Sequence, residues 1–85
     1  MVFRETSVGR VFTQNDAQKF VGRCMRYDSE IILEFGTKKI NGKSLMGIIS
    51  MGLKSGDKVT VITKGDDQEE ALDAAIKQLS ATVSV

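Results

Sequence analysis

The sequence predicts an α+β fold in which a four-stranded antiparallel sheet carries three helices on one face, an open-faced β-sandwich. Two observations lead to this fold class. Short β-branched or alternating segments, typical of strands, are interleaved with segments whose apolar residues recur at helical spacing. The resulting order, β-α-β-β-α-β-α, suits an antiparallel sheet whose second face is open to solvent. Glycines separate neighbouring segments and mark the turns between them: Gly36, Gly42, Gly56 and Gly65.

The first half of the chain contains two predicted strands and one predicted helix. Residues 2–8 alternate weakly and end near a glycine, which suggests a strand. Residues 16–27 place apolar side chains at helical spacing, with Asn15 or Asp16 as the expected cap. Residues 30–35 form a β-branched and aromatic run of strand length.

The second half completes the pattern. Residues 38–41 predict a short returning strand, and residues 45–53 predict a short, buried helix. Residues 58–63 alternate and predict the last strand. Residues 65–67 open the last helix, and the acids in its first turn lie where the helix dipole favours negative charge. The apolar positions of that helix recur three and four apart: Ala71, Leu72, Ala75, Ile76 and Leu79.

Length, composition and charge describe one domain over residues 1–85 and exclude several classes of partner. A hydrophobic content of 41% and a charged content of 27% are ordinary for a globular protein. The net charge of +1 lacks the excess of basic residues that is typical of duplex binding, so we expect no direct contact with nucleic acid. No segment is long and apolar enough to cross a bilayer, and no secretory signal is visible. We therefore expect a cytoplasmic protein with no membrane partner.

The residue types also argue against an enzyme. The chain contains no histidine, which excludes imidazole catalysis and a Cys/His zinc site. Its single cysteine, Cys24, lies on the apolar stripe of the first helix, where a buried and inert thiol is expected. The acids at 66–70 are best explained by the dipole of the last helix. We expect no cofactor, no metal ion and no catalytic residue.

Ser44 is the candidate functional residue. It precedes the apolar run that starts at Leu45, where a hydroxyl faces the unpaired N–H groups of a helix start. The simplest interpretation is an N-cap, which contributes about 0.5–2 kcal/mol. A capping serine can also be phosphorylated, because the dianion meets the positive end of the helix dipole. That charge would lie beside an apolar patch formed by Leu45, Met46 and Ile49.

Residues 41–51, which read Asn-Gly-Lys-Ser-Leu-Met-Gly-Ile-Ile-Ser-Met, resemble the regulatory-serine segment of the HPr-like family. This family contains the small phosphocarriers of the bacterial sugar phosphotransferase system and their catabolite-repression paralogues of the Crh type. Residues 56–60 and 65–72 resemble the family's later turn, strand and helix start. The motif resemblance extends from 29 to 79 without gaps, and the order of elements matches the family fold over the whole chain.

One segment departs from the family pattern. In the family, Gly-Leu-His-Ala-Arg-Pro-Ala precedes the first helix and carries the histidine that accepts phosphate. Residues 11–17 here read Val-Phe-Thr-Gln-Asn-Asp-Ala. Thr13 therefore stands in the place of the histidine, Asn15 in that of the arginine and Asp16 in that of the proline. Because a threonine hydroxyl without a neighbouring base is a poor nucleophile, we expect a chain that is not competent for histidyl phosphoryl transfer.

The resemblance implies two partners that recognise Ser44. HPr kinase/phosphorylase would add and remove the phosphate, and a catabolite-control transcription factor would bind the seryl-phosphorylated form. Lys19 or Arg10 would have to compensate for the missing family arginine in that second contact. The resemblance thus implies a regulatory protein in carbon catabolite regulation. The residues expected to contact partners around and beyond Ser44 are Lys43, Leu45, Met46, Gly47, Ile49 and Lys19.

An alternative hypothesis is a phosphorylation-independent protein-binding module on a degenerate HPr scaffold. It would dock its target through the basic first helix, which carries Lys19 and Arg23. The two hypotheses differ in what controls affinity. A phosphorylation-controlled protein depends on the charge at Ser44, whereas the module depends on Lys19 or Arg23.

Overall fold

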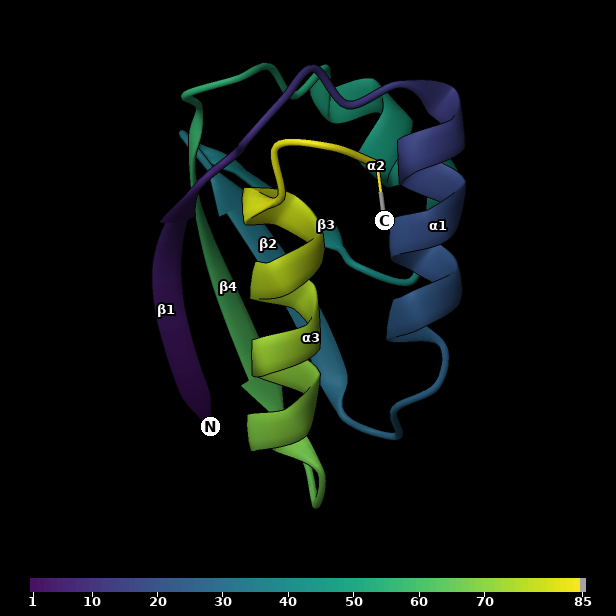
Figure 1. Cartoon of the computed structure of the whole chain (residues 1–85). Coiled ribbons are helices and arrows are strands. Elements are labelled where there is room, and N and C mark those ends of the chain that lie inside the picture. Colours follow the sequence, from purple (N-terminus) through teal and green to yellow (C-terminus); the bar gives the residue numbers. More distant parts are fainter. Residues whose placement is uncertain (85) are drawn as a thin grey trace.

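The computed structural model describes residues 1–84 and consists of a four-stranded antiparallel sheet with three helices on one face (Figure 1). Strand order in the sheet is β1-β4-β2-β3. The predicted fold class and the predicted order of elements are both confirmed. The elements are β1 (Val2–Ser7), α1 (Gln14–Cys24), β2 (Glu30–Phe35), β3 (Lys38–Asn41), α2 (Leu45–Met51), β4 (Lys58–Lys64) and α3 (Gln68–Ser80).

The central strand β4 shows that one face of the sheet is buried against the helices. It pairs with both β1 and β2, and its alternate residues Val59, Val61 and Thr63 are buried beneath the helices. Thr60 and Ile62 point to the opposite face and are only half-buried. The predicted alternation of this strand is therefore confirmed, because a strand with one covered face buries every second residue.

The hydrophobic core lies between the sheet and the helices. α3 lies against β1 and β4, α1 packs beside α3 and α2, and α2 reaches β3 (Figure 1). Within residues 1–84, no helix combines the length and the apolar character that crossing a bilayer requires. The fully buried core side chains include Phe20, Ile31, Leu33, Ile48, Leu53, Val59, Val61 and Leu79.

The first helix differs from its predicted bounds, because α1 begins two residues earlier and ends three residues earlier. Its N-cap is Thr13, not Asn15 or Asp16. The Thr13 hydroxyl accepts the N–H of Asp16 at 3.1 Å, and the Asp16 carboxylate accepts the N–H of Thr13 at 3.0 Å. This reciprocal arrangement is a capping box, and it satisfies two amides that would otherwise lack partners.

Asp67 differs from the other acids near the start of α3. Glu69 and Glu70 lie in the first turn of the helix as predicted, but the side chain of Asp67 makes no capping bond. Its carboxylate accepts the hydroxyl and N–H of Ser29 and the N–H of Asp28. These bonds, with the Ser29 hydroxyl first, hold the pKa of Asp67 below its ordinary value. Asp67 thus lies at the start of α3, as predicted, and in addition joins α3 to the loop before β2.

Gly9 allows the connection between β1 and α1 to pass close to the end of α3. Its N–H donates to the carbonyl of Leu79 at 2.9 Å. A Cβ at this position would collide with the backbone carbonyl groups of Ser80 and Ala81. The contact is between two backbones, so a larger residue could be accommodated only by moving one of them.

We predict that Gly9→Ala lowers the free energy of unfolding by about 1–3 kcal/mol, the usual cost of overpacking. Gly22→Ala is the matched control, because Gly22 lies inside α1 and nothing occupies the space around its Cβ position. That control is expected to raise the free energy of unfolding by about 0.5–1 kcal/mol. Urea denaturation of both variants measures the two effects, and a Gly9→Ala protein as stable as the wild type would contradict the packing described here.

Candidate functional site

Residues 11–17 and Ser44, which the sequence analysis singled out, lie at opposite ends of the α1–α2 pair. Phe12, just before α1, donates its N–H to the carbonyl of Leu53, just after α2, at 3.0 Å. At the other end, the Lys43 ammonium before α2 donates to the carbonyl of Tyr27 after α1 at 2.6 Å. The start of each helix is therefore beside the end of the other. The start of α1 and Ser44 are separated by the length of α2, about 10 Å for seven residues.

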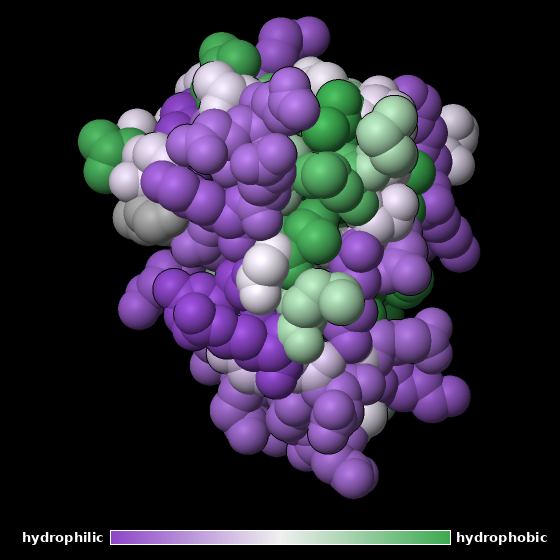
Figure 2. Space-filling model, turned by 90° about the vertical axis from the view of Figure 1, so that its right-hand side faces the viewer, coloured by the Kyte–Doolittle hydropathy of each residue, from purple (hydrophilic) through white to green (hydrophobic). Residues whose placement is uncertain are grey.

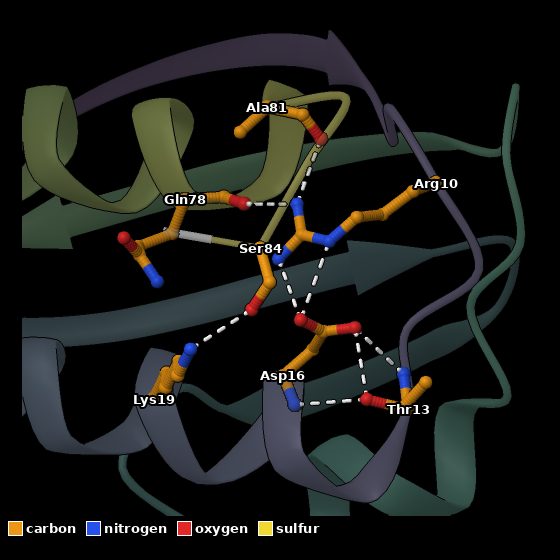
Figure 3. A network of polar contacts seen from close by, with 7 residues as sticks. All are labelled: Arg10, Thr13, Asp16, Lys19, Gln78, Ala81 and Ser84. Atoms are coloured by element: carbon orange, nitrogen blue, oxygen red, sulfur yellow. Dashed lines mark hydrogen bonds and ion pairs between the residues drawn. The ribbon is translucent and has the colours of Figure 1, made fainter.

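At the start of α1, the side chains of Arg10 and Asp16 form a buried ion pair (Figure 3). The Arg10 Nη2 lies 2.8 Å from Asp16 Oδ1, and the two side chains are only 12% and 5% exposed. Arg10 Nη1 donates to the carbonyl oxygens of Ala81 at 2.7 Å and of Gln78 at 3.4 Å. One guanidinium thus connects the loop after β1, the first turn of α1 and the end of α3.

Asp16 is held in its ionised form. The Arg10 guanidinium is the largest cause, and it outweighs the burial of the carboxyl, which acts in the opposite direction. Hydrogen bonds from the N–H and hydroxyl of Thr13 and from the Ser84 hydroxyl add to the effect, so the pKa of Asp16 lies far below its ordinary value. A carboxylate with such a low pKa is a weak base. It is therefore a poor general base for the Thr13 hydroxyl, although the hydroxyl donates to it at 3.0 Å.

This geometry bears on the charges near Thr13 and corrects the expectation about Arg10. Arg10 is unable to replace the missing family arginine in a partner contact, because its guanidinium is committed to Asp16 and to backbone carbonyls. The negative charge of Asp16 is likewise compensated within the fold. Lys19 remains exposed, with its ammonium 3.0 Å from the Ser84 hydroxyl (Figure 3).

Ser44 is the N-cap of α2, as predicted. Its hydroxyl accepts the N–H of Gly47 at 3.2 Å, and its own N–H donates to the carbonyl of Asn41 at 3.0 Å. The residue is half-buried, so it is not enclosed in the core. Ser44 therefore combines a structural role with a position at the surface.

The residues that follow Ser44 form the expected apolar patch. Met46 is 75% exposed, Ile49 is 37% exposed, and Leu45 is half-buried against the core. Figure 2, which views the molecule from the side of α1, shows a hydrophobic band flanked by hydrophilic surface. The structure thus brings together Ser44, Leu45, Met46 and Ile49, whereas Lys19 belongs to the side of α1 that faces α3.

Two of the predicted contact residues have structural roles. A Cβ on Gly47 would lie 2.7 Å from Ile40 Cγ2 and 3.1 Å from the Ser44 hydroxyl, so glycine lets α2 pack on β3 and keeps the cap bond. Lys43 is not an ordinary exposed lysine, since it is half-buried and bonded to the Tyr27 carbonyl. No local sequence pattern indicates this contact, because Tyr27 and Lys43 lie in separate loops, one after α1 and the other before α2.

Cys24 has the inert environment that the sequence indicated. It is buried in the core, and burial raises the pKa of its thiol to about 12, against a smaller opposing effect of the Lys43 charge. The thiolate, which is the reactive form, is therefore absent at neutral pH. Among residues 1–84, no three acidic, cysteine or histidine side chains are grouped so as to hold a metal ion.

Residues 13–81 match the model of the family described as PTS HPr component phosphorylation site. This chain belongs to the HPr family of the phosphotransferase system. The match begins at Thr13, the residue that caps α1.

Individual relatives within the HPr family agree with this assignment. The chain is 45% identical over 60 residues to the HPr-like protein Crh of Halalkalibacterium halodurans, which covers 71% of each chain. It is 42% identical over 57 residues to the HPr-like protein Crh of Bacillus subtilis, which covers 67% of each. The crystal structure of HPr-C-His from Thermoanaerobacter tengcongensis superimposes with a TM-score of 0.89 and 31% identity, over 96% of this chain and 94% of that one. The chain is therefore an HPr/Crh-like protein in both sequence and fold.

We predict that Asp16→Asn lowers the free energy of unfolding at neutral pH by about 3–5 kcal/mol, because it leaves the buried Arg10 without a counter-charge. Asp73→Asn is the matched control, since the Arg4–Asp73 pair is 54% and 71% exposed. That control should change the stability by no more than about 1 kcal/mol. Urea denaturation of both variants gives the comparison.

The same two proteins give a pH prediction. A carboxyl whose pKa is lowered by folding stabilises the protein above its ordinary pKa, about 3.9, and that contribution is lost as the pH falls toward the lower value. The stability difference between the wild type and Asp16→Asn should therefore shrink as the pH is lowered below about 4. A difference that stays constant down to acid unfolding would show that the charge of Asp16 does not contribute.

Proposed function

We propose that this HPr/Crh-like protein is regulated by phosphorylation at Ser44, does not relay phosphate at the place of the family histidine, and acts in carbon catabolite regulation in the cytoplasm. The observation that carries the proposal is the contrast between the two ends of the α1–α2 pair. At one end the chain lacks histidine, and a buried ion pair fills the first turn of α1. At the other end a surface serine caps α2 beside exposed apolar side chains.

The chemistry at the start of α1 supports the absence of relay. Phosphoryl relay needs a nucleophile that accepts phosphate and releases it again, and a threonine ester lacks the reactivity of a phosphorylated imidazole. A phosphoryl group on Thr13 would also lie beside the Asp16 carboxylate, whose Oδ2 is 3.0 Å from the Thr13 hydroxyl. Arg10 already neutralises Asp16, so no second charge is supplied for a dianion.

The position of Ser44 supports its modification. Its hydroxyl already accepts an amide of the first turn of α2, where a phosphate would meet the positive end of the helix dipole. Phosphorylation would place a dianion beside Met46 and Ile49 without requiring a different fold. An anionic group next to adaptable apolar side chains offers a partner both charge-assisted hydrogen bonds and contact area.

The resemblance to Crh proteins supports the identity of the partners, HPr kinase/phosphorylase and a catabolite-control transcription factor. Within this surface we assign contact roles to Leu45, Met46 and Ile49. Lys43 and Gly47 instead hold the start of α2 in position, through the Tyr27 carbonyl and the Ser44 hydroxyl.

A phosphorylation-independent binding module is the second candidate. One observation favours it: Lys19 and Arg23 are exposed and form no ion pair with any residue in the described range 1–84. A partner of this kind would lose affinity when Lys19 or Arg23 is replaced, and would be indifferent to Ser44→Ala and Ser44→Asp.

We predict that HPr kinase and ATP add one phosphate to the wild-type protein and none to Ser44→Ala, as measured by intact mass. Ser50→Ala is the matched control, because Ser50 is an exposed serine of the same helix whose hydroxyl donates to the Gly47 carbonyl at 2.8 Å. Its phosphorylation should equal that of the wild type. Unmodified wild type, or undiminished phosphate on Ser44→Ala, would contradict the proposal.

A further inference from the structure

A second polar surface lies between α1 and α3, away from the Ser44 patch. It is a hollow of about 420 Å³ lined by Lys19, Gly22, Arg23, Arg26 and Gln78. The first four come from α1 and the residues just after it, and Gln78 comes from α3. Small-ligand sites have volumes of about 300–1,000 Å³, so the hollow has the size of a site for a small molecule.

The wall on the α1 side carries an excess of positive charge. Lys19, Arg23 and Arg26 are spaced four and three residues apart, which places them on one face of the helix and its extension. All three are exposed, and none forms an ion pair with a residue of the described range 1–84. Among residues 1–84, no acidic side chain lines the hollow. The three cations therefore repel one another, and an anion bound between them would offset this electrostatic repulsion.

The α3 side of the hollow is lined by Gln78. Gln78 is only 3% exposed, and its backbone carbonyl accepts a bond from Arg10. Within residues 1–84 no buried side-chain nitrogen or oxygen lacks a hydrogen-bond partner, so its side-chain amide is not an unsatisfied group, and it takes part in the proposal only as one of the residues that line the hollow. Figure 3 shows this amide extending from α3 toward α1, on the side where Lys19 lies. The amide can donate two hydrogen bonds to a ligand in the hollow.

A neighbouring hollow of about 320 Å³ shares Arg23 and Gln78 with the first. It differs in chemistry, because Glu70, Asp73 and Tyr27 also line it. Carboxylates accept hydrogen bonds from hydroxyl groups and repel anions. The pair of hollows thus offers one position for an anionic group and an adjacent one for a neutral, hydroxylated group.

We propose that the hollow between α1 and α3 binds the phosphoryl group of a small, soluble organic phosphate. A phosphate ester carries close to two negative charges and three acceptor oxygens, which matches Lys19, two guanidinium forks and the Gln78 amide. The hydroxylated remainder of the ligand would lie toward Asp73 and Glu70. This site is independent of phosphorylation at Ser44, and either proposal can fail without the other.

The test is a titration of the ¹⁵N-labelled protein, followed by NMR, with inorganic phosphate and, separately, with glycerol 3-phosphate. Both probes should give saturable chemical-shift changes at the backbone amides of Gly22 and Arg23 and at the side-chain amide of Gln78. Arg23→Gln should lower the affinity for both probes by about tenfold or more, the usual effect of losing a charged hydrogen bond. Lys58→Gln removes the same charge from an exposed position on β4 and should leave both affinities within about twofold.

Gln78→Leu tests the amide separately, because it keeps the side-chain size and removes the donors. It should lower the affinity for both probes. The spectrum of the unliganded variant should keep the chemical-shift dispersion of the wild type, which shows that it is folded. The proposal is overturned if neither probe gives saturable shifts, or if Arg23→Gln and Lys58→Gln weaken them equally. If Gln78→Leu fails to fold, the comparison of those two charge variants decides the matter alone.

Discussion

The buried ion pair between Arg10 and Asp16 is the interaction on which the arrangement of this end of the molecule depends. A charge removed from water must be paired and hydrogen-bonded, and here both requirements are met at once. Because Arg10 also bonds the carbonyls of Gln78 and Ala81, the pair fixes the end of α3 against the start of α1. The capping box of Thr13 and Asp16 depends on the same carboxylate.

This constraint supports the proposal that an HPr-family scaffold can give up relay chemistry at this position and keep its fold. Thr13 and Asp16 at the start of α1 belong to a structural network, with the carboxylate ionised and the hydroxyl bonded. The start of α2 is held by a separate set of contacts, through Lys43 and Gly47. Because the two sets share no residue, Ser44 can keep its position whatever happens at Thr13.

The sequence predicted the strands, the last helix and the cap at Ser44, because each depends on neighbours within one element. Alternation in β4 and the spacing of apolar residues in α3 reflect a single covered face. The start of α1 was misplaced, although Thr13 followed three residues later by Asp16 is a visible variant of the capping-box pattern. That signal would have corrected the helix start.

The polar contacts of the site could not be predicted in the same way. Arg10 meets Ala81, Lys43 meets Tyr27, and Asp67 meets Ser29, so each contact joins residues far apart in the chain. No local pattern specifies such partners, because the fold must exist before the side chains can meet. The hollow between α1 and α3 has the same origin, since Gln78 and Arg23 become neighbours only when the helices pack.

The central claim is that the start of α1 has a structural role and does not relay phosphate. The most direct test follows labelled phosphate from phosphoenolpyruvate through the general phosphotransferase enzyme. A histidine-containing HPr serves as the positive control in the same reaction. We expect label on that control and none on this protein. Label on the wild-type chain that disappears in Thr13→Val would contradict the claim.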